Sequence, residues 1–233
     1  MKTKILLALL FVTNLSFGQD IGLDPIETTP EKYLKLDPNG TINNWGEDLL
    51  LPDDLLARLK AECKNPVVFK VYDTGQGYNH TDLTVGILPG SNFCNPPGST
   101  IDAQGHSTHV SGIIASKQLG LCRVLFENGL FKLKPVKILA DNGSGSFDWL
   151  ATAISTETTN DKQLLASGTF VVSNMSLGGG TAKVANVEAA LKTSSESGVI
   201  FCVAAGNTSG AGVQYPGNSQ YVLCVASLDQ NLT

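Results

Sequence analysis

The chain has 233 residues, of which 42% are hydrophobic and 16% are charged, and its formal net charge at pH 7 is −5. This composition indicates a soluble globular chain that is long enough to bury one sizeable α/β core. Its 16 Lys and Arg residues are dispersed along an acidic chain, so the sequence offers no basic surface for phosphate backbones. We therefore exclude nucleic acid from the expected partners.

The first residues have the features of a secretory signal peptide. A basic start at Lys2 and Lys4 precedes an apolar run over residues 5–12, and small residues follow that run. The run is far shorter than the roughly 20 residues that cross a bilayer, and no later segment is both long and uncharged enough to do so. We expect a signal peptide over residues 1–18, a secreted protein (extracellular or periplasmic), and no membrane contact after cleavage.

The remaining chain divides into a short leader and one domain. Residues 19–44 are rich in Pro, Thr, Asn and Asp, which is typical of a leader or linker rather than a folded unit. We assign residues 45–233 to a single domain. Its first helix is predicted over residues 51–62, where Asp53 or Asp54 can cap the helix and three leucines share one face.

Short apolar runs beyond this helix are typical of buried strands. The runs cover residues 67–72, 134–139, 168–177, 198–205 and 221–228. Helical patterns lie between them at residues 147–158 and 184–198. Strands that alternate with helices predict a parallel sheet with helices on both faces, a three-layer α/β/α fold. In such sheets the residues that handle a ligand lie just past the carboxyl ends of the strands.

Polar or glycine-rich residues follow the predicted strands, as an enzyme of this class would require. Asp73 comes directly after the first strand, and Asn207 follows the fourth strand in chain order. Glycine-rich segments at residues 143–145 and 176–180 lie at the ends of the second and third predicted strands. The sheet would therefore gather an acid, two glycine-rich edges and an amide along one rim.

Two of the three histidines lie in the stretch DAQGHSTHVSG, at positions 106 and 109. A helical zinc motif needs two His four residues apart with Glu after the first, so zinc is poorly supported. No GxGxxG sequence follows a strand, which rejects a dinucleotide site. Acid and base chemistry remains, with His106 as the better base because it would begin a helix, where the positive helix terminus disfavours premature protonation. We expect His109 to face the interior.

The cysteines fit an oxidising compartment but form no metal-ligand pattern. Their positions are Cys63, Cys94, Cys122, Cys202 and Cys224, and no two of them form a CxxC pair. An odd number leaves one thiol free or paired outside this chain. Cys202 and Cys224 each lie inside an apolar run, so we expect both to be buried.

The same residues resemble the subtilisin-like serine peptidases. Residues 73–75 (DTG) are similar to the Asp-Ser/Thr-Gly signature that follows a buried strand in this family. Residues 106–112 (HSTHVSG) are similar to its HGTHVAG signature. Further motifs follow in the family's order, namely VKILADNGSG, NMSLGG, AAGN and YPG. The resemblance covers residues 67–228.

The resemblance implies a role for each matching position. Asp73 would orient the imidazole, His106 would take a proton from a serine hydroxyl, and Asn207 would donate a hydrogen bond to the oxyanion. Two segments would flank the substrate, and their residues are Leu139, Gly143, Ser144, Gly145, Ser176, Leu177 and Gly178. An extended protein or peptide substrate between these edges would be held by main-chain hydrogen bonds, which gives broad endopeptidase specificity.

The chain also departs from the family pattern. The nucleophile motif Gly-Thr-Ser-Met-Ala is absent, so we expect the N-terminal part of a catalytic domain that is incomplete at its C-terminal end and inactive as written. Ser173 and Ser176 match strand and substrate-edge positions and are poor substitutes. We expect no cofactor for catalysis. Asp82 matches a calcium-ligand position, but the loop that would complete the site is not recognisable, so structural calcium stays open.

Three functions remain at this stage. The first is a secreted serine endopeptidase whose nucleophile segment is missing from this sequence. The second is a naturally truncated, inactive homologue that binds peptides along its glycine-rich edges. The third is an unrelated α/β hydrolase or binding protein, but an α/β hydrolase would carry its serine in a GxSxG pentapeptide, and the chain has none.

Overall fold

A computed structural model describes residues 53–77, 80–83, 86–117, 120–123, 125, 129–208, 210 and 212–227. The predicted signal peptide and leader lie outside these residues, and so do the first residues of the predicted domain. Within the described helices, none is both long and apolar enough to span a membrane.

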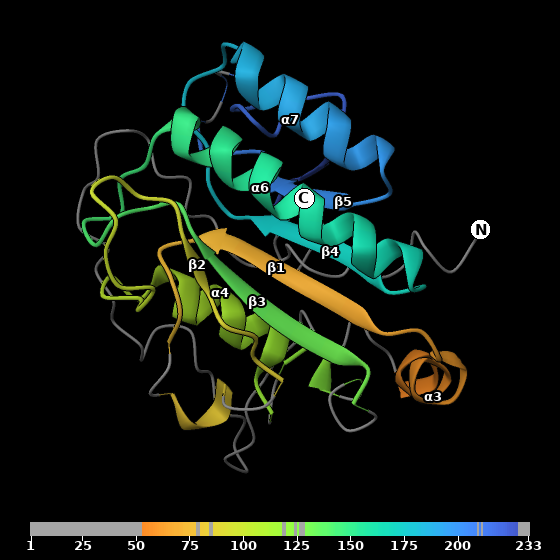
Figure 1. Cartoon of the computed structure of the whole chain (residues 1–233). Helices are drawn as coiled ribbons and strands as arrows, with labels where there is room; N and C mark the ends of the chain where they lie inside the picture. The colour runs from red at the N-terminus through yellow and green to blue at the C-terminus, as the bar shows by residue number, and fades with distance from the viewer. Residues whose placement is uncertain are drawn as a thin grey trace.

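The described strands form one parallel sheet in the order β2-β3-β1-β4-β5-β6 (Figure 1). The strands are β1 (Val67–Asp73), β2 (Ser91–Asn92), β3 (Phe131–Lys137), β4 (Phe170–Met175), β5 (Ile200–Ala204) and β6 (Leu223–Val225). The predicted parallel α/β fold is confirmed, and each of the five apolar runs overlaps one of these strands, although β3 begins three residues before the predicted run at 134–139. β2 was not predicted, because two residues are too few to show a pattern.

The helices lie on both faces of this sheet (Figure 1). They are α3 (Asp53–Glu62), the short 3-10 helix η2 (Thr81–Leu83), α4 (His106–Ala115), α6 (Phe147–Ala166) and α7 (Ala185–Glu196). Helix α6 begins where Ser146 accepts a hydrogen bond from the backbone N–H of Asp148 at 3.1 Å, as an N-cap residue does. It continues beyond the predicted range of 147–158.

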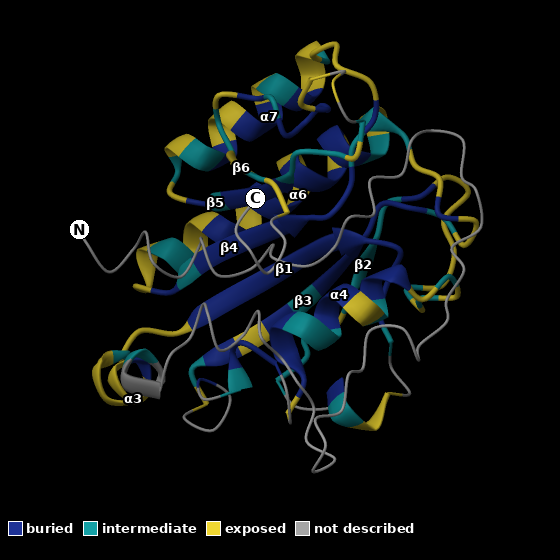
Figure 2. Cartoon of the chain, turned by 180° about the vertical axis from the view of Figure 1, so that it is seen from behind, coloured by how far each residue is buried: buried dark blue, intermediate teal, exposed yellow. Residues whose placement is uncertain are grey.

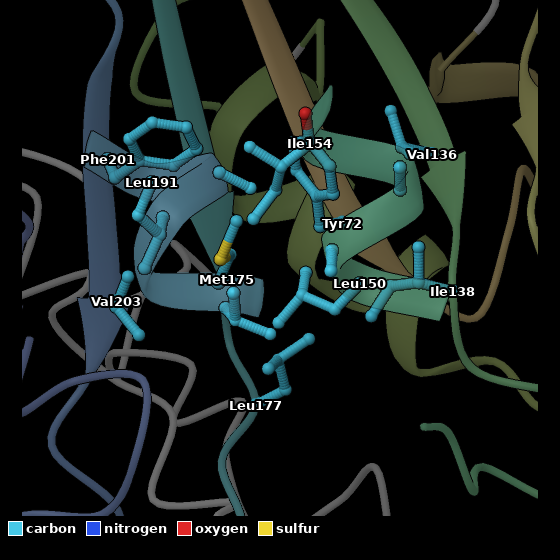
Figure 3. Close-up of a cluster of buried hydrophobic side chains, with 14 of the residues drawn as sticks. Tyr72, Val136, Ile138, Leu150, Ile154, Met175, Leu177, Leu191, Phe201 and Val203 are labelled. Carbon is cyan, nitrogen blue, oxygen red and sulfur yellow. The ribbon is translucent and has the colours of Figure 1, made fainter. Parts of the chain in front are cut away.

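Strand β1 separates two hydrophobic cores, because successive side chains of a strand point to opposite faces. Phe69 and Val71 pack with Ile114 of α4 on one face. On the other face Tyr72 packs in a cluster with Ile154 of α6, which Figure 3 shows together with residues of α7 and β5. Strands β1, β4 and β5 are largely dark blue in Figure 2, whereas the helices carry exposed residues on their outer sides. A sheet buried on both faces explains the nearly continuous apolar runs in the sequence.

Strand β6 lies at the edge of the described sheet and is more exposed than predicted. Leu223 is 42% exposed and Cys224 is also exposed, whereas Cys202 in β5 is fully buried. The prediction for Cys202 is confirmed and the prediction for Cys224 is wrong. An apolar run indicates a strand, but it does not distinguish a central strand from an edge strand that pairs, in the described part of the chain, with β5 alone.

Candidate active site

Asp73 is the last residue of β1 and has no exposed surface. The chain turns sharply after it, and Gly75 has φ +134°. A Cβ atom at Gly75 would lie 2.6 Å from the carbonyl oxygen of Thr100, so only glycine fits this close approach. The Asp-Thr-Gly sequence therefore places a buried carboxylate at the carboxyl end of the strand and lets another loop pack against the turn.

His106 is the first residue of α4 and faces this carboxylate. Its Nδ1 atom lies 2.8 Å from Oδ1 and 2.9 Å from Oδ2 of Asp73. Because an ionised carboxylate can only accept a hydrogen bond, Nδ1 carries the ring proton and its N–H donates a hydrogen bond to Asp73, which leaves Nε2 as the acceptor nitrogen when the ring is neutral. Nε2 is buried and has no hydrogen-bond partner among the residues that the structure describes.

The surroundings of His106 favour its protonated form. Burial of the imidazole on its own lowers its pKa, but the charge of Asp73, the hydrogen bond to that carboxylate and the charge of Asp102 raise it. The net result is a pKa above the ordinary value for histidine. Such a ring can take a proton at Nε2 and hold it beside Asp73.

The start of α4 is fixed by side chains from outside the helix. The backbone N–H of His106 donates to Oε1 of Gln104 at 2.8 Å, and the N–H of Ser107 donates to Oγ1 of Thr74 at 3.0 Å. Both groups belong to the first turn, whose N–H groups have no partner inside the helix. These bonds set the residue at which α4 begins, and they thereby fix the position of the His106 imidazole.

The two predicted substrate edges follow β3 and β4, the strands that flank β1. In the first edge Leu139 and Gly145 form an antiparallel bridge, and the N–H of Ala140 donates to the carbonyl oxygen of Ser144 at 2.8 Å. Ser144 and Gly145 are exposed, whereas Leu139 and Gly143 are buried. This edge is a small hairpin, and its first arm adjoins the end of β1, because the N–H of Leu139 donates to the carbonyl oxygen of Asp73 at 3.2 Å.

In the second edge Ser176 and Leu177 are buried and Gly178 is partly exposed. The N–H of Gly179 donates to the carbonyl oxygen of Tyr215 at 2.9 Å, and the N–H of Tyr215 donates to the carbonyl oxygen of Gly180 at 2.9 Å, so the chain directly after this segment pairs with Tyr215. A Cβ atom at Gly178 would lie 3.2 Å from the side chain of Gln214. The two segments thus stand on opposite sides of Asp73.

Asn207 follows β5 in a bend and is exposed. Because β5 is parallel to β4 and β1, the bend lies at the same edge of the sheet as Asp73. The structure therefore brings Asp73 and His106 into direct contact and places Asn207 on the rim that they share.

The expected burial of His109 does not hold at this site. His109 is exposed, because the buried face of α4 is formed by Val110 and Ile114, four residues apart, and His109 lies beside that face. The prediction that His109 faces the interior is wrong. Sequence reasoning also gave no role to Asp102, although an acidic residue shortly before a helix is a known helix-start signal.

Asp82, which matches a calcium-ligand position of the family, accepts hydrogen bonds from the C-terminal end of α4. One carboxylate oxygen of Asp82 accepts from the hydroxyl of Ser116, and the other accepts from the N–H of Lys117 at 3.1 Å. Within the described ranges no group of three or more His, Cys, Asp or Glu side chains could hold a metal ion. The carboxylate of Asp82 thus links η2 to the C-terminal end of α4 through hydrogen bonds.

Comparisons with known proteins agree with this geometry. The sequence profile of the Subtilase family, peptidase S8, matches residues 64–233. The chain is 36% identical over 163 residues to the thermostable alkaline protease of Halalkalibacterium halodurans, covering 69% of this chain and 41% of that protein. It is 31% identical over 165 residues to subtilisin DY of Bacillus licheniformis, covering 69% and 56%.

A solved structure shows the same fold. Sphericase matches with a TM-score of 0.63 at 28% identity, covering 79% of this chain and 60% of that one. The chain thus spans between 41% and 60% of the length of these three proteins. The family profile covers more than half of this chain, and it includes Asp73, His106 and Asn207. On these grounds the chain belongs to the subtilase family of serine peptidases.

Proposed function

We propose that the chain supplies the acid and the base of a secreted subtilisin-like serine endopeptidase. The observation that carries this proposal is the buried pair of Asp73 and His106, in which Nδ1 faces the carboxylate and Nε2 has no partner in the described part of the chain. A base with one nitrogen oriented by a carboxylate and the other left to accept a proton is the arrangement that activates a serine hydroxyl.

In the proposed reaction Nε2 of His106 takes the proton of a serine hydroxyl while the serine oxygen attacks the substrate carbonyl carbon. Asp73 stabilises the imidazolium that forms. The amide of Asn207 donates to the oxyanion, and the imidazolium then passes its proton to the leaving amine as the peptide bond breaks. Water repeats these steps on the acyl-enzyme, which releases the acid and regenerates the serine. The chemistry uses side chains alone and needs no cofactor.

The serine itself is not among the 233 residues in this proposal. Ser173 is buried inside β4, and the hydroxyl of Ser176 accepts a hydrogen bond from the side-chain amide of Asn174 at 3.0 Å. The sequence carries no Gly-Thr-Ser-Met-Ala motif. We therefore expect the 233-residue chain alone to bind peptide without cleaving it.

The substrate would be a protein or peptide in extended form. It would lie between the hairpin at residues 139–145 and the segment at residues 176–178, beside the end of β1. Main-chain hydrogen bonds to such edges place little demand on substrate sequence, which favours broad specificity. The acidic chain and its dispersed cations argue against a nucleic-acid partner.

The test compares two forms of the protein on an internally quenched peptide. We expect the whole encoded protein to cleave it, His106→Ala in that protein to abolish cleavage, and the 233-residue chain to show none. Cleavage by the 233-residue chain, or full activity in His106→Ala, would overturn the proposal. Secretion is tested separately by sequencing the N-terminus of the exported protein, which we expect to follow residue 18.

A second candidate is a peptide-binding homologue without hydrolytic activity. It is favoured by the lack of a serine partner for Nε2 of His106 in the residues that the structure describes. This candidate requires that the coding region stops after Thr233 and that peptides bind to the purified chain without cleavage. Reading the coding sequence past Thr233 decides between the two.

A further inference from the structure

Every polar backbone and side-chain atom of Thr74 forms a hydrogen bond within the protein, although the residue has no surface exposed to water. Its N–H donates to Oδ1 of Asp73 at 2.7 Å, and its carbonyl oxygen accepts from Nζ of Lys137. Its hydroxyl donates to Oδ1 of Asp102 at 2.7 Å and accepts from the N–H of Ser107 at 3.0 Å. Thr74 thus contacts the strand end, the start of α4 and the loop before that helix.

Asp102 collects the hydrogen bonds of that loop and of the helix start. Oδ1 accepts from the hydroxyl of Thr74 and from the N–H groups of Gly105 at 2.8 Å and Gln104 at 3.2 Å. Oδ2 accepts from the N–H and the hydroxyl of Thr108, at 2.7 and 2.6 Å. The carboxylate therefore caps α4 from four residues before His106, in a place where the left-handed Gly105 has no side chain to do so.

These bonds matter because Asp73 and His106 come from different elements. Asp73 is fixed by β1, whereas His106 is fixed by α4, and nothing in either element alone sets the distance between the carboxylate and the imidazole. A catalytic pair must be held within about half an ångström of its productive geometry. The hydroxyl of Thr74, directly after β1, ties the strand end to the start of α4, since it bonds the helix N–H of Ser107 and the carboxylate of Asp102 at the same time.

We propose that Thr74 and Asp102 form a positioning pair, which holds the start of α4 against the end of β1 so that His106 keeps its alignment with Asp73. The inference rests on the proposed function, because alignment matters for catalysis only if His106 is the base. Thr74 and Asp102 act through Asp73 and His106 and touch neither substrate nor the reacting atoms.

Asp102 has an electrostatic effect as well. Although its partial burial favours the neutral acid, the hydrogen bonds from Thr108, Gly105 and Thr74 lower its pKa, so it stays ionised at neutral pH. The charged groups that raise the pKa of His106 are Asp73 and Asp102, and the charge of His106 in turn lowers the pKa of His109, one turn along α4. Removal of the Asp102 charge should therefore lower the pKa of His106.

The test uses three single variants of the whole encoded protein and the double variant Thr74→Val/Asp102→Asn. Thr74→Val keeps the shape and removes the hydroxyl, Thr74→Ser keeps the hydroxyl and serves as the matched control, and Asp102→Asn keeps the size and removes the charge. For each variant the pKa of His106 is read from an NMR titration of its ring, and kcat and KM are measured on the quenched peptide.

We expect Thr74→Val and Asp102→Asn to lower kcat by about 10- to 100-fold with KM within about twofold, because a misplaced base slows the chemical step and not substrate binding. Thr74→Ser should keep most of kcat. Asp102→Asn should also lower the pKa of His106. In the double variant the two losses should fall short of additive, because both residues support one contact.

A result in which Thr74→Val and Asp102→Asn lower only the melting temperature, with kcat and the His106 pKa unchanged, would overturn the proposal and leave a structural role alone. If Asp102→Asn does not fold, the comparison of Thr74→Val with Thr74→Ser decides the question, because serine keeps the hydroxyl that valine lacks. If the whole protein cleaves no peptide, the proposed function fails, but the NMR titration still shows whether the pair positions His106.

Discussion

Strand β1 carries two buried charged groups, Lys70 and Asp73, which point to opposite faces of the sheet because they are three residues apart. Nζ of Lys70 contacts the carboxylates of Glu157, at 2.6 Å, and Asp161. Glu157 also pairs with Lys134 at 2.7 Å. Two cations and two anions thus neutralise one another beneath α6, whereas the pair on the α4 face keeps Nε2 of His106 without a partner in the described part of the chain.

This difference shows which buried charges indicate chemistry. The Lys70 cluster resembles a structural ion-pair network, in which each charge has at least one opposite charge beside it. Burial raises the pKa of Asp161 despite its contact with Lys70, while the charges of Lys70 and Lys134 lower the pKa of Glu157 despite burial. Perturbed pKa values occur at both sites, so the proposed catalytic face is distinguished by a ring nitrogen that has no partner among the described residues and lies next to an oriented carboxylate.

The largest effect should come from removal of the catalytic pair. His106→Ala or Asp73→Asn in the whole protein should lower kcat/KM by about 10⁴-fold, which is the size of effect known for such triads. Asp73→Asn keeps the volume of the side chain, so circular dichroism should show an unchanged fold. If either variant keeps kcat/KM within tenfold of the parent, the Asp73 face of β1 is not the catalytic one, and it does not differ from the Lys70 face in the way proposed.

Disruption of the Lys70 cluster should instead reduce stability. Lys70→Met leaves Asp161 without its cation and should lower the free energy of unfolding by about 3 to 5 kcal/mol, as loss of one partner of a buried ion pair does. The folded fraction should keep its activity. Lys134→Met is the matched control, because Lys134 is partly exposed and Glu157 would retain Lys70. Equal losses of stability in the two variants, measured by urea denaturation, would contradict the cluster as described.

Asn207 should have an intermediate effect that is confined to catalysis. Asn207→Ala should lower kcat by about 100- to 1,000-fold, the range set by an oxyanion donor of subtilisin, with little change in KM. The side chain is exposed at the sheet edge, so the melting temperature should stay the same. A variant that loses stability and keeps kcat would assign Asn207 to the fold and not to the site.

The smallest effect is the dependence on pH. Because the pKa of folded His106 is raised above the ordinary histidine value of about 6.5, kcat/KM should rise with pH through a midpoint above that value. The stabilising contribution of the charged pair should be fully present below pH 6.5 and be lost as pH rises through the folded pKa. Asp73→Asn should move the NMR midpoint of His106 downward, and an unchanged midpoint would show that Asp73 does not set it.

Much of the fold could be predicted because parallel strands buried on both faces give apolar runs, and five of the six described strands were found in this way. Residues at the ends of such strands meet at one edge, which put Asp73 and Asn207 on a common rim. Periodicity carries no signal for a two-residue strand such as β2, and it gave only part of α6.

The contacts that hold the site were harder to predict. Asp102 binds Thr74 across 28 positions of the chain, and a sequence shows such a bond only through a motif whose partner is already known. Exposure was also misjudged for His109 and Cys224, because burial depends on which neighbouring elements cover a residue and not on its own segment. Position along a strand or helix is a local property, whereas partners and burial are set by tertiary packing.

The most direct test of the account is covalent labelling of the whole encoded protein with a fluorophosphonate, followed by mass-spectrometric mapping of the modified residue. If His106 activates a serine, a single serine outside the described residues should be labelled in the parent protein and not in His106→Ala. Labelling that persists in His106→Ala, or a parent protein that is not labelled at all, would contradict the assignment of Asp73 and His106 as the acid and base of a serine peptidase.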